Sequence, residues 1–170
     1  MKKLILLALI FSSLANFSAF AQQDKSKRVS PPALVSQTLK SGAIVSIDYS
    51  RPSLKGRTLS ELAPSGKVWR TGANESTIFE TSKDVKIEGK DLAAGKYSIY
   101  SIPGEKEWTI IFNKTWKNWG TVYVESDDIL RIQVKPSKAK EFTEMMSFDI
   151  AKDGNVHLLW GDTQISFKIQ

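Results

Sequence analysis

The chain has 170 residues, of which 41% are apolar, and it carries 24 Lys and Arg against 18 Asp and Glu, a formal net charge of +6. It contains one His and no Cys, which excludes disulfides, thiolate metal sites and cysteine nucleophiles. This length is typical of about one domain, and the modest charge gives no reason to expect nucleic-acid binding.

The N-terminus has the pattern of a secretory signal peptide. Lys2 and Lys3 precede an apolar run, and Ala19-Phe20-Ala21 has the small-x-small form of a signal-peptidase site. The apolar run is too short to span a bilayer, so we expect export to the periplasm or medium and no transmembrane anchor in the mature chain. The predicted organisation is a signal peptide at 1–21, a flexible tail at 22–29 and one domain at 30–170.

The first half of the mature chain shows the two-residue alternation of strands with one buried face. Gly42 can supply the positive φ of a tight turn, so 33–39 and 44–50 are predicted to form a hairpin. Further strands are predicted at 77–81, 84–88, 96–102 and 108–113, the last two joined through Pro103-Gly104.

The second half continues the same pattern. Strands are predicted at 121–124 and 129–134, on either side of Ser126-Asp127-Asp128. Asp153-Gly154 predicts a type I′ turn between strands at 146–150 and 156–160, and a last strand is predicted at 165–169 after Gly161-Asp162. Only 59–62 and 137–142 have helical character, and each covers one or two turns.

These elements predict an all-β fold, a single antiparallel β-sandwich or partly open barrel with one or two short helical turns. Both Trp108 and Trp160 fall in strand patterns and are expected in the core. The longest segment without a strand pattern is 51–75, and a loop of this length is usually a functional element or a lid over the core.

The loop at 51–75 holds the best candidates for a binding site, because it contains three of the five arginines. Arginine binds carboxylate or phosphate through two parallel hydrogen bonds, and a tryptophan offers a flat apolar wall. Alternatively, Arg51 or Arg70 pairs with Glu75, Glu61 or Asp48 and only ties the loop to the sandwich. The candidate ligand-binding residues are Arg51, Arg57, Trp69, Arg70, Asn74 and Glu75.

Several motifs in this region resemble a known family. They are Tyr49-Ser50-Arg51-Pro52, Lys55-Gly56-Arg57, the run from Trp69 to Glu75, Ala94-Gly95-Lys96-Tyr97, and Ile102-Pro103-Gly104 with Glu107-Trp108. Together, and in this order, they resemble an exported family of Bacteroidota, domain of unknown function family 2911, over roughly 30–169. The resemblance implies export and a single all-β domain. It implies no reaction, cofactor or catalytic residue.

A second candidate surface contains Trp116 and Trp119, which lie beside Lys114, Lys117 and Asn118. Exposed indole rings in a loop can stack on sugar faces, although tryptophan is also an ordinary core residue of sandwiches. The sequence leaves both interpretations open.

Catalytic and metal-binding patterns are weak. His157 is the only histidine, and no Gly-x-Ser-x-Gly segment presents a nucleophile, so no Ser-His-Asp triad is predicted. Asp127 and Asp128 match no calcium loop, and no metal or other cofactor is predicted. A hydrolase would need two converging carboxylates, for which the available residues are Glu61, Glu75, Glu80, Glu107 and Glu144.

The sequence therefore favours a non-catalytic, exported binding or envelope-associated domain for an anionic or carbohydrate ligand. Two alternatives stay open. One is a hydrolase that uses paired carboxylates on an envelope or dietary polymer, and the other is a structural or assembly partner of an envelope protein.

Overall fold

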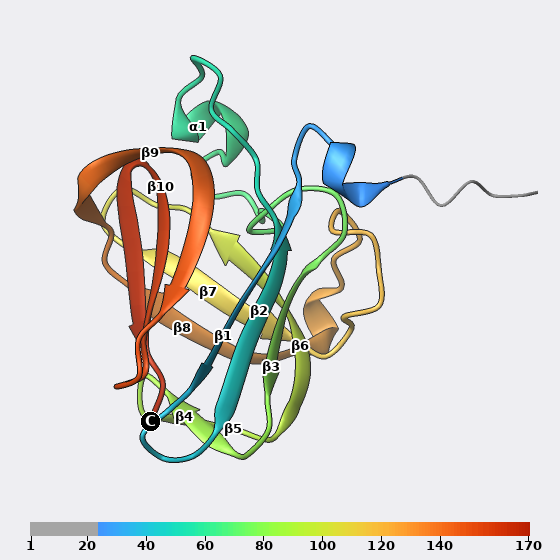
Figure 1. The fold of residues 1–170 in the computed structure, drawn as a ribbon, viewed down its shortest axis with the longest axis vertical. Coiled ribbons are helices and arrows are strands. Elements are labelled where there is room, and N and C mark those ends of the chain that lie inside the picture. The colour runs from blue at the N-terminus through green and yellow to red at the C-terminus, as the bar shows by residue number, and fades with distance from the viewer. Residues whose placement is uncertain (1–23) are drawn as a thin grey trace, which may run out of the picture.

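The computed structural model describes residues 24–170, and the predicted signal peptide at 1–21 lies outside them. Most of the described chain is antiparallel β-structure (Figure 1). The main layer is a six-stranded sheet in the order β1-β2-β3-β6-β7-β8, which does not close into a barrel. Its strands are β1 (Pro32–Thr38), β2 (Ile44–Ser50), β3 (Thr77–Thr81), β6 (Gly95–Ile102), β7 (Trp108–Asn113) and β8 (Asp128–Val134).

The second layer consists of two long paired strands, β9 (Ser137–Ile150) and β10 (Asn155–Lys168). Fifteen extended residues would span roughly 50 Å, yet the Ile169 N–H donates to the Gly154 carbonyl at 2.8 Å. The segment after Gly161-Asp162 therefore returns alongside the first part of β10, as the red ribbon in Figure 1 shows. Gly161 has a φ of +60°, which suits this reversal. The small hairpin of β4 (Val85–Ile87) and β5 (Lys90–Leu92) joins this layer through the Ile87–Ile169 bridge.

The core lies between the two layers, because alternate residues of the strands face inward. Phe112 of β7 contacts Phe79 of β3 and Phe167 of β10 edge-on, with ring centroids 5.2 and 6.0 Å apart. Tyr49 of β2 packs against Phe148 of β9, and its hydroxyl accepts a hydrogen bond from the Phe148 N–H at 3.0 Å. These aromatic pairs hold the second layer on the sheet.

Most of the predicted elements are confirmed. The 33–39 and 44–50 hairpin corresponds to β1 and β2, which pair from Pro32–Ser50 to Thr38–Ile44. The predicted helical turn at 59–62 is α1 (Leu59–Leu62), which begins with a capping box between Thr58 and Glu61. The predicted tail at 22–29 contains a short 3-10 turn, η1 (Lys25–Lys27).

The predicted strand at 121–124 is wrong. This segment has the alternation of a strand but pairs with no strand. The Val122 N–H donates to the Trp119 carbonyl at 2.8 Å, and side chains donate to two of the carbonyls. The Val122 carbonyl accepts from the Tyr100 hydroxyl at 2.7 Å, and the Val124 carbonyl accepts from Asn113 Nδ2 at 2.8 Å. The segment is a loop that ends in a 3-10 turn, η2 (Glu125–Asp127).

Two further predictions need correction. Residues 137–142 are not helical but begin β9, where Ser137 and Lys138 pair with Gln164 and Thr163. Tertiary pairing overrides the helix-forming composition of this segment. The Asp153-Gly154 turn is not type I′, since only Gly154 has a positive φ, at +91°. Instead, the Gly154 N–H donates to the Ala151 carbonyl at 2.8 Å, as in a type I turn followed by a left-handed residue.

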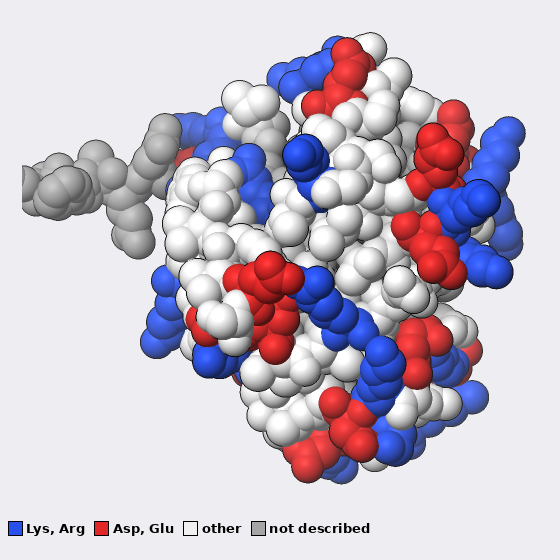
Figure 2. All heavy atoms as spheres, turned by 180° about the vertical axis from the view of Figure 1, so that it is seen from behind, with Lys and Arg blue, Asp and Glu red and all other residues white. Residues whose placement is uncertain are grey.

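No helix within 24–170 is long and apolar enough to cross a bilayer. The face in Figure 2 carries Lys and Arg side chains next to Asp and Glu around a broad uncharged area. A nucleic-acid-binding surface instead gathers basic side chains on one face.

Candidate functional site

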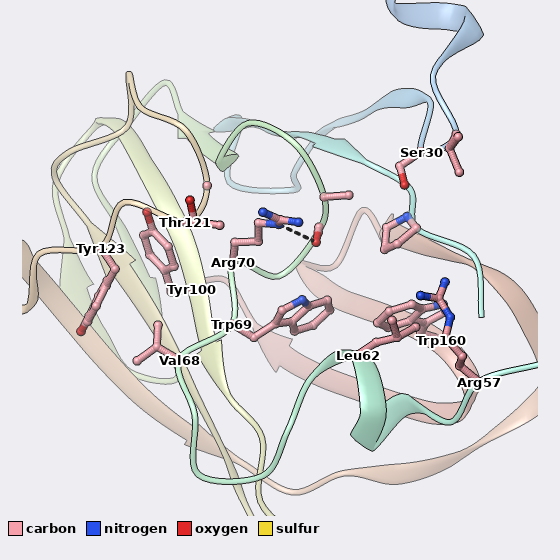
Figure 3. Close-up of a pocket in the computed structure, with 15 residues that line it drawn as sticks. Ser30, Arg57, Leu62, Val68, Trp69, Arg70, Tyr100, Thr121, Tyr123 and Trp160 are labelled. Carbon is pink, nitrogen blue, oxygen red and sulfur yellow. Dashed lines mark hydrogen bonds between the residues drawn. The ribbon is translucent and has the colours of Figure 1, made fainter. Parts of the chain in front are cut away.

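The long loop predicted at 51–75 forms part of a cavity of about 650 Å³ at one end of the sandwich. We call the neighbouring segments the N-terminal strap (24–31), the 51–76 loop and the 114–124 loop. The cavity lies between them and is closed by side chains from β6 and β10 (Figure 3). Its lining residues are Val29, Ser30, Pro52, Arg57, Leu62, Val68, Trp69, Arg70, Gly72, Ala73, Tyr100, Gly120, Thr121, Tyr123 and Trp160.

Trp69 forms a fixed wall of the cavity. Its backbone N–H and carbonyl both bond to Ser101 of β6, at 2.7 and 2.9 Å, so the main chain cannot shift independently of the sheet. Its ring stacks on Trp160 of β10, with centroids 5.4 Å apart and planes inclined by 13°, and meets Trp108 edge-on at 6.3 Å. The predicted core positions of Trp108 and Trp160 are confirmed, and Trp69 is buried with them.

Trp160 was expected only as a core residue, but it also lines the cavity. It is 2% exposed, and its indole Nε1 is a buried donor without an acceptor among the described residues. A buried N–H without a partner is costly. Its position 91 residues after Trp69 gave no sequence signal for a shared cavity wall.

The turn after Trp69 is tightly packed. Thr71 and Asn74 have positive φ angles of 51° and 59°, and Thr77 Oγ1 donates to the Thr71 carbonyl at 2.9 Å. A Cβ on Gly72 would lie 2.7 Å from Thr77 Oγ1, so only glycine fits this turn without a shift of its neighbours. This compact turn sets the direction in which Arg70 leaves the main chain.

The arginines predicted in the 51–76 loop bond to main-chain carbonyls, not to Glu61, Glu75 or Asp48. Arg70 Nε donates to the Gly72 carbonyl at 3.3 Å. Arg57 donates to the carbonyls of Leu54 and Ser53, at 2.9 and 3.1 Å. Arg51 donates to the Met146 carbonyl of β9 at 2.9 Å and does not line the cavity. The predicted pairing of Arg51 or Arg70 with a carboxylate is therefore wrong.

These bonds leave guanidinium donors free at the cavity. Both Nη groups of Arg70 and the Nη1 group of Arg57 have no hydrogen-bond partner among residues 24–170. No Asp or Glu lies among the lining residues. Figure 3 shows Arg70 beside Trp69, with its guanidinium on the side away from Tyr100 and Tyr123, and Arg57 beyond Trp160. The cavity thus offers cationic donors next to an indole wall.

The remaining predicted residues hold the N-terminal strap. Glu75 accepts two hydrogen bonds from Arg28 Nη1, at 2.9 and 2.7 Å, and lies 3.3 Å from Lys25 Nζ. Asn74 Nδ2 donates to the Ser30 carbonyl at 3.0 Å. Neither Asn74 nor Glu75 lines the cavity, but they fix the strap whose Val29 and Ser30 do. They act here as structural supports of the cavity wall.

Burial alone would raise the pKa of Glu75, but hydrogen bonds from Arg28, its own backbone and Lys25 outweigh it and lower the pKa to about 2. A carboxylate with a lowered pKa adds stability above its unfolded pKa, near 4.5 here, and this stability is lost as the pH falls toward 2. We therefore expect the stability difference between wild type and Glu75→Gln to be largest above pH 5 and to shrink between about pH 4.5 and 2. Urea denaturation at several pH values measures this difference. A difference that stays constant down to pH 2 would contradict the ion-paired state of Glu75.

Tyr100 and Tyr123 form the wall opposite Trp160, and sequence reasoning did not identify them. Their rings meet at 4.9 Å. The Tyr100 hydroxyl donates to the Val122 carbonyl, and the Tyr123 hydroxyl donates to Asp128 at 2.7 Å and accepts from Arg131 at 2.8 Å. Burial and the Asp128 hydrogen bond raise the pKa of Tyr123 to about 12. Both hydroxyls already donate within the protein, so these rings offer mainly apolar surface.

Trp116 and Trp119 do not form an open pair of stacking surfaces. The Nζ atoms of Lys96 and Lys117 lie 5.3 and 4.9 Å from the centre of the Trp116 ring. Trp119 is 51% exposed, and its backbone forms a bridge with Glu75. The sugar-stacking hypothesis would therefore depend on Trp119.

Four of the five carboxylates considered for hydrolysis, all but Glu107, are engaged at separate places. Glu61 caps α1, Glu80 lies 3.1 Å from Lys96, and Glu144 accepts from the Lys55 N–H at 2.7 Å. His157 Nδ1 lies 2.8 Å from Ser166 Oγ, but neither residue lines a described cavity. Within 24–170, no three His, Asp or Glu side chains are grouped as a metal site would require.

The comparisons with known proteins identify a family but no activity. The model of a family described as "Protein of unknown function (DUF2911)" matches residues 30–169. No curated protein and no solved structure matches the chain. The chain belongs to the DUF2911 family, as the motifs between Tyr49 and Trp108 indicated.

Proposed function

We propose that this member of the DUF2911 family is a non-catalytic binding domain that takes a small anionic ligand in the cavity beside Trp69. The observation that carries the proposal is the set of free guanidinium donors on Arg70 and Arg57 in a cavity without a lining carboxylate. The cavity volume of about 650 Å³ lies within the range of small-molecule sites.

Arg70 is the proposed anchor of the anion. It is half-buried, and its Nε bond to Gly72 orients the guanidinium while both Nη groups stay free. Two Nη groups in one plane can donate to two oxygens of a carboxylate or phosphate. A partly buried site strengthens this interaction relative to bulk water.

The lining favours an anion over a neutral sugar. Sugar hydroxyls both donate and accept, so sugar sites usually supply side-chain acceptors as well as donors. The lining residues include no Asp, Glu, Asn or Gln, both tyrosine hydroxyls donate elsewhere, and the hydroxyls of Ser30 and Thr121 are the other side-chain acceptors of the lining. The unengaged side-chain donors are mainly cationic.

The first test is a thermal-shift titration of the purified protein with acetate, benzoate, inorganic phosphate and glucose, at constant ionic strength. We expect at least one of the anions to raise the Tm, with a shift that grows as the logarithm of its concentration above Kd, and glucose to leave the Tm unchanged. Arg70→Ala should weaken anion binding by about 10- to 100-fold, because it removes charge-assisted hydrogen bonds. It should cost little stability, since Arg70 makes one long hydrogen bond, at 3.3 Å.

The matched control is Lys67→Ala, which removes the same charge from an exposed residue of the same loop that does not line the cavity. It should leave anion binding within about twofold of wild type, since exposed charges interact weakly. Equal losses in the two variants would mean that net charge rather than the Arg70 site attracts the anion. The proposal fails if no anion shifts the Tm of the wild type.

A further inference from the structure

We define the apolar rim as those exposed apolar side chains that line the cavity or are chain neighbours of a lining residue. Val29 and Val68 line the cavity, yet they are 75% and 41% exposed. Trp119 and Val122, each 51% exposed, are chain neighbours of the lining residues Gly120 and Thr121. Single exposed apolar residues are common on any protein, but these four account for four of the nine large exposed hydrophobics within 24–170.

The rim is built from three separate segments of the chain. Val29 lies in the N-terminal strap, Val68 in the 51–76 loop, and Trp119 and Val122 in the 114–124 loop. The strap is held by Arg28, Lys25 and Ser30 through Glu75 and Asn74, and the side chain of Val29 takes no part in these polar contacts.

The apolar character continues from the rim into the cavity. Leu62, Trp69 and Trp160 line the inner wall, and Figure 3 places Val68 beside the tyrosines and Leu62 beside Trp160. The free Nη groups of Arg70 lie within this apolar surround. A ligand that filled the site would meet cationic donors at one point and apolar surface over much of the rest.

We infer that the ligand is an amphipathic anion. Its carboxylate or other anionic head binds the Nη groups of Arg70, and its apolar body lies along Trp69 and leaves the cavity over Val68. This inference rests on the proposed function, because it uses the same anion site. Inorganic phosphate would leave the apolar wall and rim exposed to water.

The test is a calorimetric titration of the protein with acetate, hexanoate, octanoate and decanoate, each below its micelle concentration. We expect the affinity to rise with chain length, by up to roughly fourfold for each methylene that becomes fully buried. Decanol, which has the apolar chain without the anionic head, should bind at least about tenfold more weakly than decanoate.

Paired variants test the rim. Val68→Ser should weaken decanoate binding by about three- to tenfold and leave acetate binding unchanged, because only the apolar body reaches the rim. Ile44→Ser is the matched control, since Ile44 is 52% exposed and lines none of the described cavities. Both side chains are exposed, so neither change should unfold the protein.

The outcomes separate the two proposals. Binding of short anions through Arg70 with no gain from hexanoate to decanoate would overturn the amphipathic ligand and leave the anion site standing. Equal losses in Val68→Ser and Ile44→Ser would also overturn it. If no carboxylate of any length binds, both the amphipathic ligand and the proposed function are overturned. A parallel titration with phosphatidylglycerol vesicles distinguishes two sources of the ligand. Vesicle binding that depends on Arg70 and Val68 would indicate a lipid presented by a bilayer. No vesicle binding would indicate that the ligand is a free monomer.

Discussion

Replacing Gly154 with Ala is expected to destabilise the protein by about 3–5 kcal/mol, the largest loss that any single methyl group should cause here. Gly154 has a φ of +91°, which disfavours any side chain. An added Cβ would also overlap the main-chain carbonyl of Ile169. The Ile169 N–H donates to the Gly154 carbonyl at 2.8 Å, so the clash would break the contact that closes the second layer. In a domain of this size the Tm should fall by roughly 10 °C.

Gly89→Ala is the matched control for this loss. Gly89 has a similar φ of +78°, but an added Cβ would meet no atom within 4 Å. It should therefore cost only the conformational penalty, about 1 kcal/mol. Differential scanning calorimetry of both variants measures the comparison. Equal losses of stability in the two variants would show that the close approach of Ile169 to Gly154 does not affect the stability.

Gly120→Ala is expected to have the largest effect on the cavity. An added Cβ would lie 2.7 Å from Arg70 Cδ and about as close to main chain, at 3.0 and 3.1 Å from the carbonyl oxygens of Asn74 and Glu75. Its φ is not positive, so the backbone conformation itself tolerates Ala. The long side chain of Arg70 yields more easily than the two carbonyls, and we expect it to be displaced. Anion affinity should fall by at least about tenfold while the free energy of unfolding falls by about 1–2 kcal/mol.

The control for Gly120→Ala is Gly66→Ala in the 51–76 loop. Gly66 has a φ of +73° and no neighbour within 4 Å of an added Cβ, so this variant should lose a similar amount of stability without moving Arg70. Calorimetric titration with the best anion of the panel compares the two. Full anion affinity in Gly120→Ala would place the bound anion away from Arg70.

The sandwich could be predicted because its strands alternate strictly and end at turn-forming residues. In β2, Val45, Ile47 and Tyr49 face the core, as their spacing indicated. The two strands of the hairpin lie close in sequence. The 51–76 loop could be identified by the same reasoning, as the long segment without alternation. Where the local pattern and the tertiary pairing agree, sequence periodicity is sufficient to predict the strands.

The errors arose where side chains or distant strands decide the conformation. Residues 121–124 have strand alternation, but Tyr100 and Asn113 satisfy their carbonyls. Residues 137–142 favour a helix, but the returning part of β10 pairs with them. Neither partner is adjacent in sequence, so neither influence can be seen in a local window.

For the same reason, only some of the residues that line the cavity could be identified from the sequence. Arg57, Trp69 and Arg70 were chosen from one segment and do share a cavity. The pairing of Arg28 with Glu75 spans 47 positions, and the Trp69–Trp160 stack spans 91, so the closing walls had no local signal. An unusual cluster of arginines can indicate where a site begins. The distant residues that form its other walls are known only once the fold is known.

A crystal structure of the protein grown with a saturating concentration of the best-binding anion would test the central claim most directly. The account predicts the anion inside the cavity beside Trp69, with two of its oxygens within hydrogen-bond distance of the Arg70 Nη atoms, about 2.7–3.2 Å. Density for the anion at surface lysines such as Lys114 or Lys117, with the cavity holding only water, would contradict it.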